Sequence, residues 1–319
     1  MNVLADVQKW MLEPGINEEE FSHRRKVFLE QYYKLRQKNE NGVLGQLSLR
    51  TRKKLHPLIL AVYTIKNHLG GFQYTMVDDK REKTERSVIY AVTHIGKFDI
   101  EVVSEALKEH FYILSGDFEH IQGIIDEPFL NLNGVFYFNE TEKADRKAVT
   151  EKMIGLLQEG GNLMYFPEGT WNLSPNLPVL PCYWGIVEIA RKGNAIIVPV
   201  AAEQYGKHFD INVGKNLDMQ KYGASQEEKA LAIAELQDIL ATLKWEIWER
   251  HPQSRRDILE NEWETYQDAR FREWTYFSLD YVDTLIYKPK NVTSPREAFA
   301  HMDKLIPCKE NAFLFRKER

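Results

Sequence analysis

The region between residues 72 and 215 most strongly constrains the fold, because short apolar runs alternate there with segments of helical length. The runs predict seven strands, at Phe72–Val77, Ser87–Thr93, Phe111–Leu114, Gly134–Phe138, Asn162–Phe166, Ala195–Ala201 and Phe209–Val213. Between them we expect helices at Phe98–Glu109, Lys143–Gln158 and Tyr183–Lys192. This alternation predicts an α/β fold whose central sheet is mainly parallel and covered by helices on both faces.

The flanking segments have helical patterns. Glu18–Gln37 is charged and amphipathic, and the more apolar Leu55–Leu69 ends at a glycine pair. Ser225 and Glu228 form a capping-box pattern for a long helix towards Arg250. Beyond it, aromatic residues recur at helical spacing and suit a core or a dimer contact, with a lipid-facing belt as the alternative: Trp263, Tyr266, Phe271, Trp274, Phe277 and Tyr281. We therefore expect a helical region at 1–71, an α/β domain at 72–250 and a helical extension at 251–319.

Charge and cysteine usage narrow the class of partner. The net charge of -5 argues against nucleic acid as the main ligand. The two cysteines, Cys182 and Cys308, form neither a metal cluster nor a CxxC pair, which is typical of a reducing compartment. No secretory signal or run of about 18 apolar residues is present, so we expect a cytoplasmic protein, soluble or on the inner membrane surface.

A basic cluster precedes the apolar segment Leu55–Tyr63 and has two interpretations. It suits either binding to anionic lipid or a solvated helix end. Its members are Arg50, Arg52, Lys53 and Lys54.

His94 and Asp99 are the first candidate catalytic residues. The apolar run before His94 predicts that the histidine lies where a strand ends, and Asp99 falls in the first turn of the next helix. Gly96 permits the chain to turn between them, so the two side chains can meet at the ligand-binding edge of the sheet. A carboxylate that holds one imidazole nitrogen leaves the other free to accept a proton. A loop histidine beside a helix N-terminal acid is the alternative interpretation.

A second motif follows another predicted strand. Phe166-Pro167-Glu168-Gly169-Thr170 ends the run Leu163–Phe166 at the same edge of the sheet. We expect Glu168 to accept hydrogen bonds from a hydroxylated ligand and the Gly169 region to expose backbone N–H groups. A simple turn, with Glu168 as a cap, is the alternative.

Together these residues resemble the motifs of the glycerolipid acyltransferases, which act on glycerol-3-phosphate or lysophosphatidic acid. His94 and Asp99 match the H-x4-D motif, and Phe166–Thr170 matches FPEGT. Weaker matches at Gly134–Phe138, Ile197–Val200 and Val213–Lys215 follow in the family's order, over roughly residues 85 to 250. The resemblance implies that His94 and Asp99 deprotonate an acceptor hydroxyl, which attacks acyl-CoA or acyl-carrier protein as co-substrate, without metal or cofactor.

The chain departs from the family pattern where the acceptor is expected. Trp171 and Glu140 stand where the family has arginines that contact phosphate, whereas Glu168, Gly169 and Thr170 match it. A carboxylate repels a phosphomonoester, and an indole offers a stacking face, so we expect a neutral lysolipid, glycolipid or sugar. Arg146 offers a phosphate contact instead, if its loop shifts, or is a solvated residue at the start of a helix. We expect Tyr183 and Trp184 either to line the site or to pack in the core.

Three functional hypotheses follow. The first is O-acyl transfer to a hydroxylated acceptor, with glycerol-3-phosphate or lysophosphatidic acid as the alternative to a neutral one. The second is a catalytically idle lipid- or sugar-binding relative, and the third is a thioester hydrolase that uses water. The sequence does not decide acceptor, chain length, donor or oligomeric state.

Overall fold

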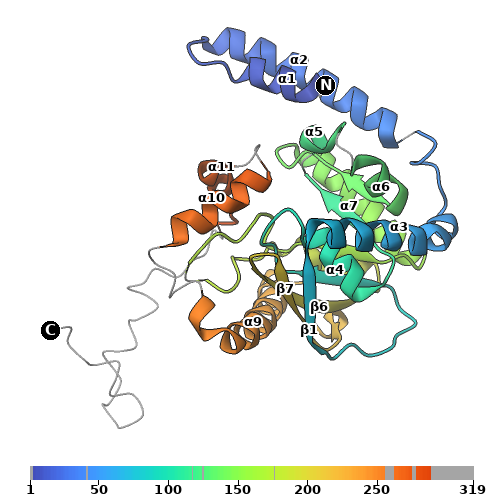
Figure 1. Ribbon diagram of the computed structural model, residues 1–319. Helices are drawn as coiled ribbons and strands as arrows, with labels where there is room; N and C mark the ends of the chain where they lie inside the picture. Colours follow the sequence, from blue (N-terminus) through green and yellow to red (C-terminus); the bar gives the residue numbers. More distant parts are fainter. Residues whose placement is uncertain are drawn as a thin grey trace, which may run out of the picture. The chain divides into compact units, whose positions relative to one another are not determined.

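The computed structural model describes residues 3–40, 42–116, 118–123, 126–175, 177–255, 262–274 and 278–288 (Figure 1). The chain divides into one unit spanning Met1–Tyr287 and a second spanning Lys288–Arg319. Only Lys288 of the second unit is described, so Cys308 lies outside the described residues, as does Phe277. The boundaries expected at residues 71 and 250 stay predictions.

The central sheet has eight strands in the order β1-β7-β6-β2-β5-β3-β4, with β8 paired to β6. Their bounds are β1 Gln73–Asp79, β2 Val88–Val92, β3 Tyr112–Ser115, β4 Val135–Tyr137, β5 Leu163–Tyr165, β6 Ile196–Tyr205, β7 His208–Val213 and β8 Leu217–Asp218. All pairings are parallel except those of β6 with β7 and β8. The predicted α/β fold with a mainly parallel sheet is therefore confirmed. The antiparallel β6–β7 pair turns through Gly206, whose φ of 62° suits glycine.

Helices cover both faces of this sheet. They are α1 Val3–Met11, α2 Glu18–Glu40, α3 Leu49–Gly70, α4 Asp99–Leu107, α5 Phe118–Ile121, α6 Glu127–Asn133, α7 Lys143–Gln158, α8 Gly185–Lys192, α9 Gln226–Arg250, α10 Trp263–Glu273 and α11 Leu279–Leu285. Short 3₁₀ turns lie at Met219–Lys221 and Pro252–Ser254. Helix α1 lies within the region expected to be helical, whereas the short helices α5 and α6 were not expected, because their sequences are too brief for a clear helical period.

The alternation of side chains along β2 divides the core into two layers. Ile89 and Ala91 pack in one cluster with residues of α7, α8 and α9. Val88, Tyr90 and Val92 pack in the other with residues of α4. Because successive strand residues point to opposite faces, a strand that is buried throughout must be covered on both sides. The site-bearing ends of β2 and β5 are thus held by a rigid core.

Helix α3 begins six residues before the expected Leu55. Ser48 caps it by accepting a hydrogen bond from the Thr51 N–H at 3.2 Å, and Gly71 ends it in a left-handed conformation. Arg52, expected in an exposed basic cluster, is instead buried, and its guanidinium donates to the carbonyls of Asn131 and Leu132 at the end of α6. It therefore caps a helix and does not face lipid.

The aromatic residues after Pro252 pack inward. Tyr266, Phe271, Trp274 and Tyr281 surround a small buried cluster of Trp171, Leu173 and Val282. These described residues of the extension are thus part of the core beside the FPEGT segment, in agreement with the core interpretation. In the described residues, no helix is both long and apolar enough to cross a bilayer.

Candidate active site

His94 and Asp99 meet as their spacing predicted. His94 follows the end of β2, and Asp99 is the first residue of α4. The His94 Nδ1 lies 2.8 Å from Asp99 Oδ2, so Nδ1–H donates to the carboxylate and Nε2 is left to accept a proton. The Asp99 side chain is fully buried, whereas that of His94 is 19% exposed. This difference places the orienting group inside the protein and the imidazole at a surface that a substrate can reach.

Asp99 also shapes the turn that carries the histidine. Its Oδ2 accepts the backbone N–H groups of Ile95 at 2.8 Å and Gly96 at 3.2 Å. One carboxylate oxygen therefore fixes the imidazole and the chain around it at the same time.

Glu168 has a structural role that its sequence motif did not indicate. Its carboxylate is fully buried and accepts the His94 N–H at 2.9 Å through one oxygen and the Leu180 N–H at 2.7 Å through the other. Burial raises the pKa of Glu168, although these two backbone donors and the charge of Lys244 oppose the shift. Glu168 therefore ties two loops together and is not among the residues that line the cavity described below, and its contact with an acceptor stays a prediction.

Gly169 and Thr170 differ in what they offer a ligand. The Gly169 N–H donates to the Phe166 carbonyl at 3.1 Å, so the expected exposed donor is already used within the turn. Glycine is needed there because its φ is 75° and an added Cβ would lie 2.5 Å from the Tyr183 ring. The Thr170 hydroxyl is buried without a hydrogen-bond partner among the described residues, and Thr170 lines the cavity described below. In this turn, the Thr170 hydroxyl is thus a buried polar group beside the cavity whose hydrogen-bonding capacity the described residues do not use.

Aromatic rings hold the imidazole from two sides. The ring of Phe166 stacks on that of His94 at a centroid distance of 4.1 Å, and Trp171 meets it edge-on at 6.2 Å. Trp171 is only 3% exposed because Leu173 and Val282 cover it. The indole is thus a wall of the site, and the open stacking face that we expected for a sugar ring is not available.

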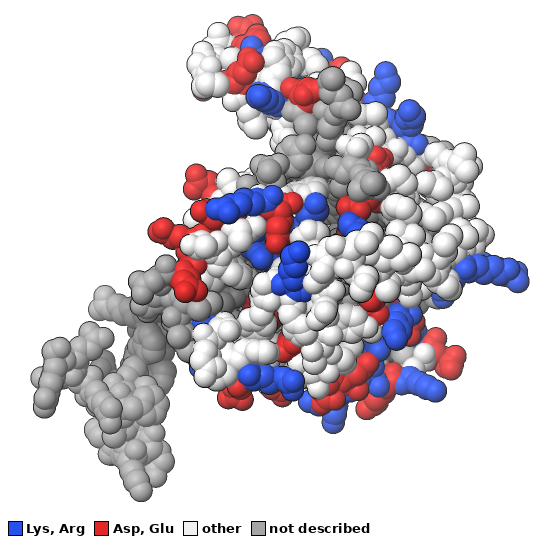
Figure 2. All heavy atoms as spheres, viewed as in Figure 1, with Lys and Arg blue, Asp and Glu red and all other residues white. Residues whose placement is uncertain are grey.

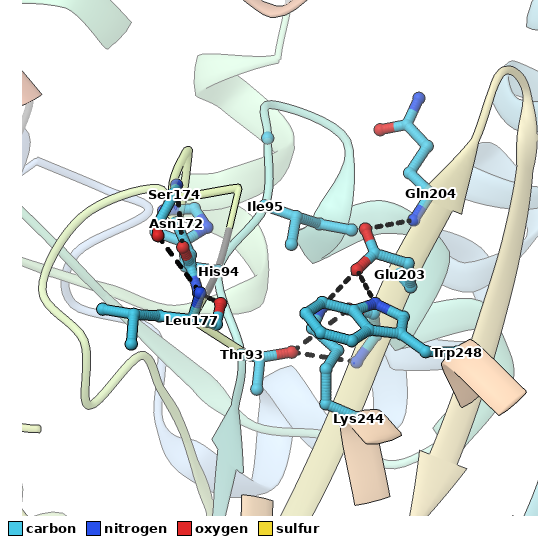
Figure 3. A network of polar contacts seen from close by, with 12 residues as sticks. Thr93, His94, Ile95, Asn172, Ser174, Leu177, Glu203, Gln204, Lys244 and Trp248 are labelled. Atoms are coloured by element: carbon cyan, nitrogen blue, oxygen red, sulfur yellow. Dashed lines mark hydrogen bonds and ion pairs between the residues drawn. The ribbon is translucent and has the colours of Figure 1, made fainter. Parts of the chain in front are cut away.

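A buried polar network supports the loop from beneath (Figure 3). The Thr93 hydroxyl accepts the Ala202 N–H at 2.9 Å and donates to the Ala202 carbonyl, which links the end of β2 to β6. Lys244 forms a buried ion pair with Glu203 at 3.3 Å. On the other side, the Asn172 N–H donates to the His94 carbonyl at 2.7 Å. Residues from β6, α9 and the FPEGT loop therefore fix the backbone of His94.

His94 opens into a cavity of about 1050 Å³. One part is apolar and lies between the sheet, α7 and α8, where it is lined by Leu114, Phe138, Val149, Met153, Ile154 and Ile189. Cationic and acidic groups line other parts, among them Lys97, Lys143, Arg146, Glu140, Glu151 and Glu188. The cavity thus offers the imidazole both an apolar chamber and a polar surface.

The remaining predicted residues lie around this cavity. Glu140, Arg146, Tyr183 and Trp184 all line it, so the core interpretation of Tyr183 and Trp184 is wrong. Glu140 Oε1 accepts the Tyr281 hydroxyl at 3.2 Å, and the Arg146 guanidinium donates to the Glu140 backbone carbonyl. Arg146 therefore needs no loop shift to lie near the site.

Sequence reasoning missed the contribution of the C-terminal extension to the site. Trp274, Leu285 and Tyr287 line the same cavity as His94. Their aromatic and apolar character was visible in the sequence, but nothing local to them signals which loop they cover. Lys97, whose ammonium lies 5.1 Å from the centroid of Trp274, was also missed although it stands between His94 and Asp99.

Comparison with known proteins agrees with this geometry. Residues 74–203 match the acyltransferase family model. A solved structure of the 1-acyl-sn-glycerophosphate (LPA) acyltransferase PlsC from Thermotoga maritima is similar in fold, with a TM-score of 0.51 and 15% sequence identity. The match covers 70% of this chain and 96% of that one. No curated protein matches the sequence significantly.

These findings show what the chain is similar to. Residues 74–203 match the acyltransferase family model, and the chain is similar in fold to a solved glycerolipid acyltransferase. Both matches support an acyltransferase activity for this chain.

Proposed function

We propose that the protein is an O-acyltransferase that moves a fatty acyl group from acyl-CoA or acyl-carrier protein to an acceptor hydroxyl. His94 Nε2 removes the hydroxyl proton while Asp99 holds the opposite nitrogen, and the oxygen attacks the thioester carbonyl carbon. The tetrahedral intermediate then breaks its C–S bond, and the imidazolium returns the proton to the leaving thiolate. The observation that carries this proposal is the 2.8 Å contact between Nδ1 and Asp99 at the wall of a large cavity.

Thr170 supplies a hydrogen bond to the intermediate in this proposal. Its buried hydroxyl has no partner among the described residues and lines the cavity that His94 enters. A donor held in place before the reaction stabilises developing negative charge without reorganisation. The apolar side chains that α7 and α8 contribute to the cavity, Val149, Met153, Ile154 and Ile189, suit an acyl chain.

We assign a neutral hydroxylated lipid or glycolipid as the preferred acceptor. Glu140 lines the cavity with its carboxylate held by Tyr281, and Tyr183 and Tyr287 line it too. A carboxylate disfavours a phosphomonoester, whereas acidic and phenolic oxygens accept and donate hydrogen bonds to hydroxyl groups.

A phosphorylated acceptor is the second candidate. Lys143 and Arg146 line the same cavity, and a guanidinium binds phosphate well. Lysophosphatidic acid and glycerol-3-phosphate are the acceptors that this interpretation favours.

Contact with a membrane surface belongs to the same proposal, because the product is a lipid. Helix α3 exposes Leu58, Ile65 and Leu69, each at least 60% exposed and spaced to share one helical face. Figure 2 shows few charged side chains on the surface where Figure 1 places α3. Arg50 and Lys54 remain exposed at the start of the helix. An apolar stripe with basic residues beside it suits binding at the lipid interface.

Thiol release tests the proposal. The purified enzyme is given a long-chain acyl-CoA or acyl-carrier protein with a monoacylglycerol, a lyso-glycolipid, lysophosphatidic acid or glycerol-3-phosphate. We expect release that depends on acceptor, is fastest with a neutral one and forms the acylated product. Higher kcat/KM with the phosphorylated acceptors would select the second candidate. Thiol release that does not depend on any acceptor indicates a hydrolase. Absence of thiol release with every pair of thioester and acceptor indicates a catalytically idle relative.

A further inference from the structure

The helices α10 and α11 lie outside the matched residues 74–203, yet they contact the segment that follows the FPEGT motif beside His94. Gln267 donates to the Leu173 carbonyl at 3.2 Å, and Val282 packs in the cluster of Trp171 and Leu173. The Tyr183 hydroxyl donates to the Leu285 carbonyl at 2.9 Å. The extension is therefore built into the site.

Arg270 anchors this segment behind the catalytic turn. It is 5% exposed, and its guanidinium donates to the Gln204 side chain at the end of β6. A Cβ on Gly96 would lie 3.6 Å from both Cδ and Nη1 of Arg270, so the arginine is in contact distance of the turn between His94 and Asp99. Arg270 also pairs with Glu273 at 3.2 Å. Burial raises the pKa of Glu273, and the charge of Asp99 adds to the shift, so both carboxylates lie in one electrostatic environment.

The same segment forms part of the cavity wall. Trp274, Leu285 and Tyr287 line it, and the Tyr287 ring lies 4.7 Å from that of Tyr183. The Tyr281 hydroxyl donates to Glu140 Oε1, so a residue of α11 sets the direction of a carboxylate that faces the acceptor region. An acceptor hydroxyl that enters this part of the cavity therefore meets a carboxylate whose direction α11 sets.

We propose that α10 and α11 form the acceptor-selecting wall of the enzyme, with Tyr281 as a specificity-determining residue and Arg270 as a positioning residue. This inference rests on the proposed function. Tyr281 keeps Glu140 directed towards acceptor hydroxyl groups, which favours a neutral headgroup over a phosphomonoester. Arg270 holds the wall against the Gly96 turn, so that a selected acceptor meets His94 in a reactive position.

Tyr281→Phe tests the specificity role. The measured quantity is the ratio of kcat/KM for a monoacylglycerol to that for lysophosphatidic acid. Tyr222→Phe is the matched control, because it removes a hydrogen bond to Glu235, which does not line the cavity, whereas the Tyr281 partner Glu140 does. We expect Tyr281→Phe to change the ratio by about tenfold or more, as loss of a polar contact in a specificity site does. A ratio equal to that of the wild-type enzyme in the folded variant overturns the assignment.

Arg270→Met tests the positioning role, with Arg272→Met as the control on the exposed side of α10. We expect kcat to fall about tenfold or more for every acceptor while the KM for the thioester stays constant. Amide hydrogen exchange at Ile95 and Gly96 should become faster only in Arg270→Met. Unchanged kcat or unchanged exchange overturns the role. If the wild-type enzyme acylates no acceptor, the proposed function fails, while the exchange measurement still decides whether Arg270 anchors the turn.

Discussion

Replacing Glu168 by glutamine distinguishes a carboxylate that ties loops together from one that binds the acceptor. In the native site its two oxygens accept the N–H groups of His94 and Leu180 at 2.9 and 2.7 Å. Hydrogen bonds to a charged group contribute about 1.5–3 kcal/mol each. Glutamine keeps one acceptor oxygen and turns its amide donor towards the other N–H, which leaves that donor unsatisfied. The substitution also removes the desolvation penalty of the buried charge, which is what raises the pKa of Glu168. We therefore expect the free energy of unfolding to fall by about 2 kcal/mol, near the lower end of the range for one such hydrogen bond.

Urea unfolding measures this loss of stability. With an m-value of about 3 kcal/mol per M, the midpoint should fall by about 0.7 M. Because the displaced backbone is that of His94, kcat should fall about tenfold while the acceptor KM changes little. Glu30→Gln, at an exposed position of α2, is the control and should leave both quantities unchanged. The reasoning is refuted if Glu168→Gln keeps its unfolding midpoint and instead raises the acceptor KM tenfold.

Three further perturbations test other parts of the account. Asp99→Asn should lower kcat about 10³–10⁴-fold with normal acceptor binding, since the amide no longer fixes the required tautomer of the imidazole; near-normal turnover would contradict this. Burial lowers the pKa of His110 from 6.5 to about 4, so between these pH values the unfolded chain binds a proton that the folded chain does not. The free energy of unfolding should therefore fall by up to about 3 kcal/mol as the pH falls from 6.5 to 4. Chemical denaturation of His110→Gln should show a free energy of unfolding that depends less on pH over the same range. Lys244→Met leaves the Glu203 charge buried without its cation, so the free energy of unfolding, measured by the same chemical denaturation, should fall by about 3–5 kcal/mol. The double variant Lys244→Met with Glu203→Gln should recover much of this loss.

The sequence was sufficient to predict the mainly parallel sheet and the contact between His94 and Asp99, for a local reason. Strands β2 and β5 are buried on both faces, so their apolar runs stand out and end where the chain turns. His94 and Asp99 are five residues apart across such a turn, and a glycine between them permits the geometry. Short-range signals of this kind depend little on the rest of the fold.

The roles of Glu168 and Arg52 were not predictable, because their partners are distant in sequence. Leu180 is twelve residues from Glu168, and the carbonyls that Arg52 contacts belong to α6. A charged residue in a loop or at the start of a helix is normally solvated, and only tertiary packing shows that it is buried with backbone partners. The contribution of α10 and α11 escaped prediction for the same reason, since Arg270 meets Gln204 across 66 residues of sequence.

The most direct test of the account is the rate of acceptor-dependent thiol release by His94→Gln, measured beside the wild-type enzyme with saturating thioester and acceptor. We predict a loss of about 10²–10⁴-fold, the usual contribution of a general base, with the thermal unfolding midpoint close to that of the wild-type enzyme. A folded His94→Gln variant that transfers acyl groups within about threefold of the wild-type rate would contradict the assignment of His94 as the base.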